Sequence, residues 1–250
     1  MTELRMTTAD SAQRLNEWGQ PIGFAVENWS PPPFPPHVPL SGRHCRIEPL
    51  QAARHARDIW QAQAEDSTGA GWTYLFSGPF AKCEELERYL AEAEASRDPQ
   101  FYAIVVEGRA VGMAAYLRID PKNGVIEIGH IYFSPRLAQT RAATEAMFLF
   151  MSNAFELGYR RYEWKCDSCN LPSRAAAARL GFTYEGKFRQ AIVYKCRNRD
   201  TTWFSILDAD WNAGLKDAYL HWLGDANFDA SGKQRRRLSQ LTAPFVYARS

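Results

Sequence analysis

Two hydrophobic periods along the chain predict most of its secondary structure. Two-residue alternation and short apolar runs predict strands over residues 43–50, 101–106, 110–119, 125–133, 161–166, 182–193 and 201–207. Apolar positions at three- and four-residue spacing predict helices over residues 51–64, 81–96, 143–154 and 173–180. An antiparallel meander that leads into strand–helix–strand predicts one α/β domain whose mixed, mostly antiparallel sheet is flanked by helices.

The domain is expected over residues 41–212, between an N-terminal arm (1–40) and a C-terminal extension (213–250). The arm holds a proline-rich segment at residues 31–39, and proline favours an extended, left-handed backbone. Such a segment could bind a proline-recognition domain. Because Trp29 and Phe34 flank and interrupt the prolines, packing across its own domain is favoured.

Composition and charge exclude several functional classes. The chain is 46% hydrophobic, enough for a sizeable core, and its net charge of +2 argues against nucleic acid or an anionic membrane as the main partner. No apolar run approaches the ~20 residues that span a bilayer. The polar N-terminus lacks the apolar stretch of a signal peptide, so a cytoplasmic location is expected. The basic run at residues 233–237 is interpreted as solvated tail, with contact to RNA or to a phosphate left open.

The five cysteines do not form an evident disulfide framework. Cys166 and Cys169 form a C-x-x-C pair, which leaves redox chemistry or zinc binding open. A structural zinc site needs about four ligands, and no second pair completes the set. Free thiols are therefore the favoured interpretation, and no metal is expected.

Four segments at consistent spacing resemble the GNAT acyltransferases, particularly their RimJ/RimL-like branch. The most specific reads N-x-x-S at Asn170, then L-G-F-x-x-E-G from Leu180. The other segments are residues 127–135 running into Thr144-Glu145-Ala146, residues 155–161 and residues 197–201. The resemblance covers residues 41–211. It implies a GNAT-like single domain that transfers an acetyl group from acetyl-CoA to a primary amine by direct attack.

The resemblance also implies where the coenzyme binds. The family usually has a basic or amide residue, then a glycine and then a glycine or alanine just before a helix, and here Ala138, Arg141 and Ala143 take those three positions, so an arginine stands where glycine is usual. Backbone N–H groups at the helix start can still hold a diphosphate, and Arg141 could add a direct contact. The expected coenzyme-binding residues are Ile131, Tyr132, Phe133, Ala138, Gln139, Thr140, Arg141, Ala142, Ala143, Thr144, Asn170 and Ser173. Thr140 or Thr144 could instead only cap the helix.

Glu127 is the leading candidate for the general base, directly or through water. An unpaired carboxylate in an apolar strand is costly, although a half-exposed strand would also tolerate it. His130 is the alternative base, and strict alternation places it on the opposite strand face. Ser173 resembles the serine that protonates the departing thiolate, with Asn170 holding the pantetheine arm. Ordinary helix capping by Asn170 is compatible with both roles.

Trp72, Tyr74 and Phe76 lie in a loop that the resemblance implies as the acceptor-pocket wall, although core packing would also explain them. An α-amine titrates near 8 and a lysine near 10.4, a difference worth ~3.5 kcal/mol at neutral pH. If catalysis does not require Glu127 as a base, the acceptor is therefore expected to be an α-amine or another amine of low pKa. The acceptor is expected to be a small molecule or the α-amine of a peptide or protein, and a homodimer is left open. The alternative function is a catalytically inactive coenzyme-A-binding module with a regulatory or interaction role.

Overall fold

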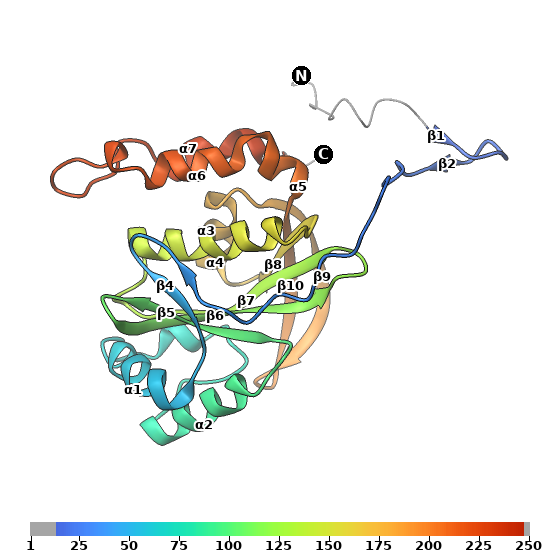
Figure 1. Ribbon diagram of the computed structural model, residues 1–250. Helices are drawn as coiled ribbons and strands as arrows, with labels where there is room; N and C mark the ends of the chain where they lie inside the picture. Colours follow the sequence, from blue (N-terminus) through green and yellow to red (C-terminus); the bar gives the residue numbers. More distant parts are fainter. Residues whose placement is uncertain (1–13, 248–250) are drawn as a thin grey trace.

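The computed structural model describes residues 14–247, in which an eight-stranded sheet forms the centre of the molecule (Figure 1). Residues 1–13 and 248–250, the ends of the predicted arm and extension, lie outside the described range. Neighbouring strands are antiparallel except for β7 and β8. In sheet order the strands are β3 (Leu40–Ser41), β4 (Arg46–Pro49), β5 (Gln100–Val106), β6 (Arg109–Asp120), β7 (Val125–Phe133), β8 (Arg161–Asp167), β10 (Arg197–Leu207) and β9 (Thr183–Tyr194).

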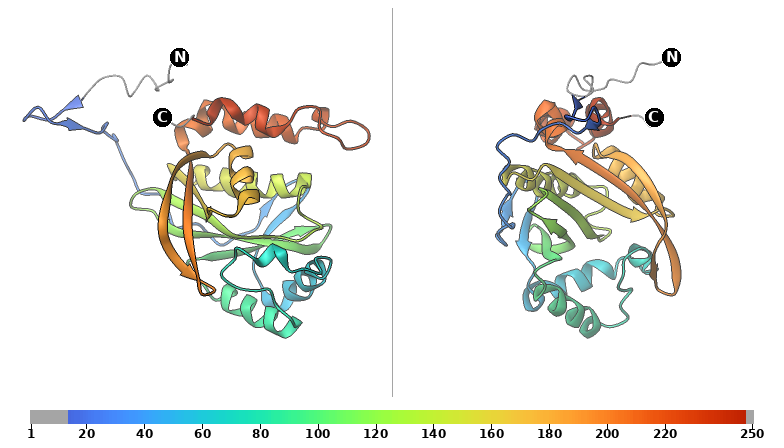
Figure 2. Two further views of the ribbon diagram at one scale, coloured as in Figure 1. Left: turned by 180° about the vertical axis from the view of Figure 1, so that it is seen from behind. Right: turned by 90° about the vertical axis from the view of Figure 1, so that its right-hand side faces the viewer.

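Helices cover both faces of this sheet (Figures 1 and 2). One face carries α1 (Ala52–Gln63) and α2 (Cys83–Glu94), joined by a loop with the short helix η1 (Ala70–Trp72). The other face carries α3 (Arg141–Glu156) and α4 (Leu171–Arg179), and α6 (Lys216–Leu223) and α7 (Leu238–Thr242) pack on the outer side of these two helices. The short turns α5 (Asp208–Asp210), η2 (Trp211–Leu215), η3 (Asp225–Asn227) and η4 (Ala243–Phe245) complete the C-terminal part. This arrangement confirms the predicted fold class.

Each face of the sheet has its own hydrophobic core. The stripe of Met147, Phe150, Met151 and Ala154 on α3 is buried in the larger core. Burying apolar area at about 25 cal/mol per Å² makes such a stripe the main force that docks the helix. Under the opposite face, α1 and α2 bury a second cluster that includes Leu86. The sheet is thus fixed from both sides.

The two parallel strands β7 and β8 separate along their length. They pair only between residues Val125–Ile128 and Arg161–Trp164. Beyond that point β7 remains paired with β6 on its other side, but its register shifts between Gly129 and Tyr132. His130 lies within this shift at a φ of 48°, a left-handed conformation that non-glycine residues rarely adopt. The irregularity turns the end of β7 away from β8 and opens the sheet.

The N-terminal arm packs partly on its own domain, as expected for its prolines. Carbonyl groups of Pro33 and Pro35 accept hydrogen bonds from the Tyr159 hydroxyl and the Gln100 amide. Before them, a small hairpin of β1 (Arg14–Leu15) and β2 (Pro21–Ile22) projects from the molecule (Figure 1).

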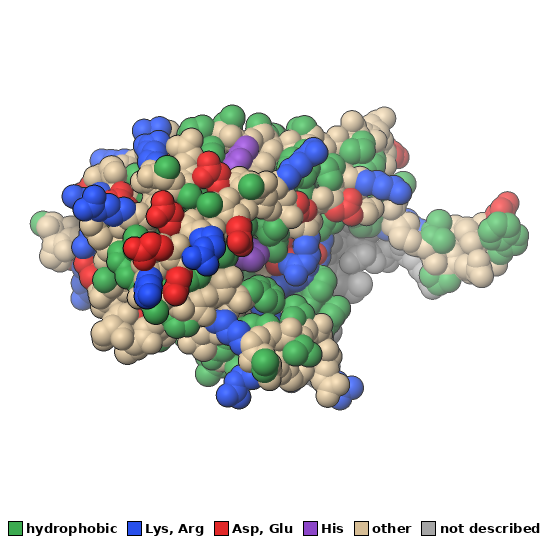
Figure 3. All heavy atoms as spheres, turned by 90° about the horizontal axis from the view of Figure 1, so that it is seen from below, with side chains coloured by type: hydrophobic (Ala, Val, Ile, Leu, Met, Phe, Trp, Pro, Cys, Tyr) green, Lys and Arg blue, Asp and Glu red, His purple; other side chains and the backbone are tan. Residues whose placement is uncertain are grey.

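The C-terminal residues from 213 onward form helices that the hydrophobic pattern did not predict. Tyr219, Trp222 and Leu238 are buried in the larger core, so this segment contributes to the main domain. No helix among residues 14–247 is long and apolar enough to cross a membrane. Acidic and basic side chains are interspersed on the molecular face shown in Figure 3.

Candidate active site

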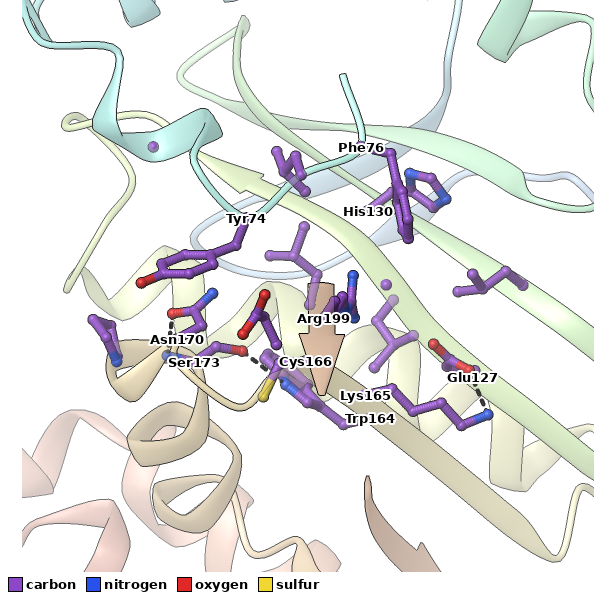
Figure 4. A pocket seen from close by; sticks show the side chains of 18 of the residues that line it. Tyr74, Phe76, Glu127, His130, Trp164, Lys165, Cys166, Asn170, Ser173 and Arg199 are labelled. Atoms are coloured by element: carbon purple, nitrogen blue, oxygen red, sulfur yellow. Dashed lines mark hydrogen bonds and ion pairs between the residues drawn. The ribbon is translucent and has the colours of Figure 1, made fainter. Parts of the chain in front are cut away.

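The opening between β7 and β8 leads into a cavity of about 360 Å³ (Figure 4). Its walls come from β6, β7, β8, β10, the start of α4 and the loop after α1. Side chains that line it include Tyr74, Phe76, Glu127, His130, Trp164, Lys165, Cys166, Asp167, Asn170, Ser173 and Arg199. The structure therefore brings together both predicted catalytic residues, Glu127 and Ser173, although they lie 46 positions apart in the sequence.

Ser173 is fixed by the start of α4. Asn170 is the N-cap, and its side-chain oxygen accepts a hydrogen bond from the Ser173 backbone N–H at 3.0 Å. The Ser173 hydroxyl oxygen accepts a hydrogen bond from the Trp164 indole at 3.0 Å, so its own proton can point elsewhere. The capping interpretation and a chemical role are thus compatible at this position.

Glu127 is buried and held by two cations. Its carboxylate accepts two hydrogen bonds of 2.7 Å from the Arg118 guanidinium and forms a 2.8 Å ion pair with Lys165. Burial raises the pKa of the Glu127 carboxyl, and the positive charges of Lys165 and Arg118 oppose that rise. The side chain is not the exposed carboxylate that a half-exposed strand would carry.

The ion pairs continue away from the cavity across β8 to β9. The Lys165 ammonium also contacts Glu163 at 2.7 Å, and Glu163 pairs with Arg161 at 2.6 Å. Arg161 in turn binds Glu185 through both guanidinium ends. In this ladder, defined by Arg118, Glu127, Lys165, Glu163, Arg161 and Glu185, each buried charge has a neighbour of opposite sign. Such pairing is what makes buried charges tolerable.

His130 lines the same cavity as Glu127, so the expectation of strict alternation is wrong here. The register shift in β7 changes which way its side chains point. The imidazole packs against the Phe101 ring at 4.9 Å between centroids. Burial lowers the pKa of His130 to about 4, with the nearby charges of Arg118 and Arg199 adding to the shift. The ring is therefore neutral at physiological pH.

Two of the three predicted aromatic residues reach the cavity. Tyr74 and Phe76 line it, and the Tyr74 hydroxyl donates to the Cys169 carbonyl at 3.1 Å. Trp72 does not, because it is buried beneath the loop and stacks on Tyr132 at 4.2 Å. For Trp72 the core-packing alternative describes the observed position.

The predicted phosphate turn lies at the N-terminus of α3. Thr140 caps the helix by accepting a hydrogen bond from the Ala143 N–H at 3.1 Å, and Gln139 adopts a φ of 64°. The Arg141 side chain turns to the C-terminal segment, where it donates to the Leu223 carbonyl and to Asp225 and covers the Phe228 ring. The backbone N–H groups of Arg141 and Ala142 remain as first-turn donors.

A second cavity, of about 750 Å³, borders this turn. Gln139, Thr140 and Arg141 line it together with His44, Arg179 and Lys233. Two of its polar atoms, His44 Nε2 and Arg141 Nε, are buried without a hydrogen-bond partner. Unpaired donors and cations beside a helix N-terminus suit a phosphate-bearing ligand. Lys233 of the basic run thus lines this cavity, a position compatible with the phosphate contact that was left open beside the favoured solvated-tail interpretation.

The remaining predicted residues surround these two cavities. Ile131 lines the first cavity, and Tyr132 and Phe133 continue β7 beyond its last pairing with β8. Ala142, Ala143 and Thr144 are buried in the first turns of α3, where the Thr144 hydroxyl accepts from Arg179 at 3.0 Å. Ala138 belongs to the turn before the helix, and its N–H bonds to the Ser134 carbonyl.

Arg199 lines the first cavity but was not predicted as a site residue. It lies in the segment 197–201 that resembles the family, where no role was assigned to it; the structure places it on β10, with the Arg199 guanidinium in the first cavity. No local signal marks it, because its neighbours Asn198 and Asp200 are equally polar.

The five cysteines are free thiols, and Cys166 lines the first cavity while Cys169 is exposed. Burial raises the pKa of the Cys166 thiol. Among residues 14–247, no group of three or more His, Cys, Asp or Glu side chains is suited to hold a metal ion.

Comparisons with known proteins agree with this geometry. The model of the Acetyltransferase (GNAT) family matches residues 57–182. A GCN5-related N-acetyltransferase from Brucella melitensis is 47% identical, covers 87% of this chain and 100% of its own, and has a TM-score of 0.85. A probable acetyltransferase of the GNAT family from Chromobacterium violaceum is 40% identical, covers 77% and 98%, and has a TM-score of 0.72. A search of curated proteins found no match.

The chain belongs to the GNAT family of acetyltransferases. A more distant structure, the acetyl transferase from Salmonella typhimurium that modifies the N-terminal serine of ribosomal protein L7/L12, is 18% identical with a TM-score of 0.59 and shares the fold. Family members take their acetyl group from acetyl-CoA. The two cavities fit that coenzyme, since one offers unpaired donors for phosphate and the other lies beyond the opening between β7 and β8.

Proposed function

We propose that this protein transfers an acetyl group from acetyl-CoA to the primary amine of a small molecule or peptide, by direct attack. The observation that carries the proposal is the opening between β7 and β8, next to the N-terminus of α3 and continuous with a cavity that holds Ser173. The segment Asn170-Leu171-Pro172-Ser173 supports placing the enzyme in the RimJ/RimL-like branch, and a cytoplasmic location accords with that branch.

In this proposal the coenzyme supplies an activated thioester. The N–H groups of Arg141 and Ala142 bind its diphosphate at the positive end of the α3 dipole. The free edge of β7 at residues 131–133 hydrogen-bonds the pantetheine arm, because β8 no longer occupies that edge. Arg141 acts through its backbone, since its side chain is engaged by Asp225 and the Leu223 carbonyl.

Ser173 donates a proton to the departing thiolate. Its hydroxyl lies in the cavity, and the Trp164 indole donates to the oxygen, which orients the hydroxyl proton away from that ring. The Asn170 cap holds the Ser173 backbone in place. A positioned acid of this kind contributes about 10²–10⁴-fold to the rate.

Glu127 is the base predicted from the sequence, but its two ion pairs oppose this role. Protonating the carboxylate would weaken its contacts with Arg118 and Lys165. The His130 imidazole is neutral and forms no ion pair or hydrogen bond with the described residues, so it can receive a proton, although a pKa of about 4 makes it a weak base. We therefore propose an acceptor amine of low pKa, such as an α-amine, with Glu127 organising the charges around it.

A thiol-release assay with acetyl-CoA and a panel of primary amines tests the proposal. The expected result is free coenzyme A released in equal amount to the acetylated amine. Binding of the coenzyme without thiol release from any amine would contradict it and would indicate the inactive coenzyme-binding module instead.

A further inference from the structure

Arg199 is a buried cation that has no counterion among the residues that the structure describes. Only 7% of the residue is exposed, and its guanidinium lines the first cavity. Its Nε is buried without a hydrogen-bond partner, and the described residues provide the side chain with no ion pair. The Arg199 Cζ lies over two aromatic rings, 5.2 Å from the centroid of Phe76 and 5.6 Å from the centroid of Tyr194. Figure 4 shows it near the middle of the cavity.

The other charged groups of the cavity are satisfied. Glu127 forms ion pairs with Arg118 and Lys165, the two other cations in the lining, and Lys165 is also paired with Glu163. Asp167 accepts hydrogen bonds of 2.8 Å from the Tyr194 hydroxyl and from the Cys169 N–H. A buried charge that lacks such partners is unfavourable for folding, and it persists where a ligand supplies the missing group.

We propose that Arg199 binds a carboxylate on the acceptor, so that the substrate class is amines that also carry a carboxylate group. This inference rests on the proposed function, because it places the acceptor in the first cavity. A guanidinium presents a planar fork of donors that matches a carboxylate in two parallel hydrogen bonds. The flanking rings of Phe76 and Tyr194 keep that fork in a fixed plane.

The position of Arg199 separates this carboxylate site from the phosphate region. Arg199 does not line the cavity at the start of α3, where Arg141, Arg179 and Lys233 gather. The aromatic side chains of Tyr74, Phe76 and Trp164 suit an apolar or aromatic body for the acceptor.

Direct binding tests the inference without requiring turnover. Calorimetry in the presence of coenzyme A would measure the affinity of the protein for phenylacetate and for its neutral counterpart phenylacetamide. The full chain is expected to bind phenylacetate at least about tenfold more tightly, a factor typical of a hydrogen bond to a charged group. Arg199→Gln should abolish that preference, and Arg199→Lys should retain part of it. Equal affinity of the two compounds for the unchanged chain, or failure to bind either, would overturn the inference.

A matched control removes a cation from the neighbouring strand. Lys187 on β9 is half-exposed and outside the first cavity, so Lys187→Gln should leave the preference unchanged. Thermal unfolding shows whether the variants fold. Arg199→Gln should be at least as stable as the unchanged chain, because it removes an uncompensated buried charge. Loss of coenzyme affinity in Arg199→Gln, with the phenylacetate preference intact, would assign Arg199 to the coenzyme and contradict the proposal.

Turnover separates this inference from the proposed function. Phenylalanine should be acetylated with a kcat/KM at least about tenfold above that of phenylalaninamide, and Arg199→Gln should remove the difference. If no amine is acetylated while phenylacetate binding still depends on Arg199, the proposed transfer fails and the carboxylate site stands. Acetylation of both amines with equal kcat/KM, unaffected by Arg199→Gln, would refute the carboxylate site and leave the transfer intact.

Discussion

Glu127 and Arg199 are both buried charges that line one cavity, but among the described residues only Glu127 has ion-pair partners. Glu127 is held by Arg118 and Lys165 at 2.7 and 2.8 Å, within a ladder of ion pairs that crosses the sheet. Arg199 has aromatic neighbours and no counterion among the described residues. Glu127 therefore has counterions without a ligand, whereas Arg199 gains one only if a ligand supplies it.

This difference distinguishes charged groups that stabilise the folded site from charged groups that bind a ligand or take part in catalysis. Protonating or removing one member of the ladder leaves its partner as a buried charge without a counterion, which is strongly destabilising. The ladder residues are therefore expected to keep their charges during catalysis. An unpaired group in the same cavity carries no such restraint. We therefore expect mutations in the ladder to affect stability first and mutations of unpaired groups to affect binding and rate first.

The largest effect is expected from Lys165→Met, which breaks the ladder at its centre. Glu127 and Glu163 would both lose a buried cation, and breaking a buried pair typically costs about 3–5 kcal/mol. Chemical denaturation should show a loss of that size in the free energy of unfolding. Lys187→Met, which removes a half-exposed cation, should change it by less than about 1 kcal/mol. Equal effects of the two changes would show that the ladder has no special role.

Ser173→Ala should lower kcat by about 10²-fold, because the thiolate would leave without a positioned proton donor. Coenzyme affinity should change little, since the Asn170 cap is on the backbone N–H of residue 173. Steady-state kinetics and calorimetry measure the two quantities. Ser168→Ala, which removes a hydroxyl bonded to Thr202 outside the cavity, is the matched control. Unchanged turnover in Ser173→Ala would eliminate its role as the acid.

His130 should make the fold sensitive to acid. Its pKa is about 4 in the folded protein and 6.5 when unperturbed, so between these values the unfolded chain binds the additional proton. Stability contributed by the neutral imidazole is therefore lost as pH falls from about 6.5 to about 4, by at most about 1.4 kcal/mol per pH unit. The measurement is the free energy of unfolding as a function of pH, for the unchanged chain and for His130→Gln. The difference between these two profiles isolates the contribution of His130. A flat difference between the two profiles would contradict the lowered pKa.

Glu127→Gln is expected to give the smallest change in rate, less than about tenfold, because its carboxylate is committed to Arg118 and Lys165. The pH dependence of kcat/KM should keep its shape and follow the acceptor amine. A loss of 10²-fold or more with intact coenzyme and acceptor binding would restore Glu127 as the base.

Periodicity predicted the elements that depend on local sequence. The α3 stripe of Met147, Phe150 and Met151 and the strand pattern around Tyr162 and Trp164 required only side-chain spacing. The C-terminal helices escaped prediction because Tyr219 and Trp222 become buried only against the rest of the domain. A segment that draws its stability from tertiary packing carries a weak local signal.

The site was less predictable because its geometry depends on distant contacts. Glu127 could be picked out as a carboxylate in an apolar strand, but its partner Lys165 lies on another strand. The register shift at His130 broke the alternation from which its direction was inferred. Arg199 enters the cavity only because β10 lies beside β8 in the sheet.

A crystal structure with bound coenzyme A tests the central claim most directly. The diphosphate should accept hydrogen bonds from the backbone N–H groups of Arg141 and Ala142, the pantetheine arm should follow the free edge of β7, and the sulfur should lie beside the Ser173 hydroxyl. Coenzyme bound away from the opening between β7 and β8, or a sulfur directed away from the first cavity, would contradict the claim.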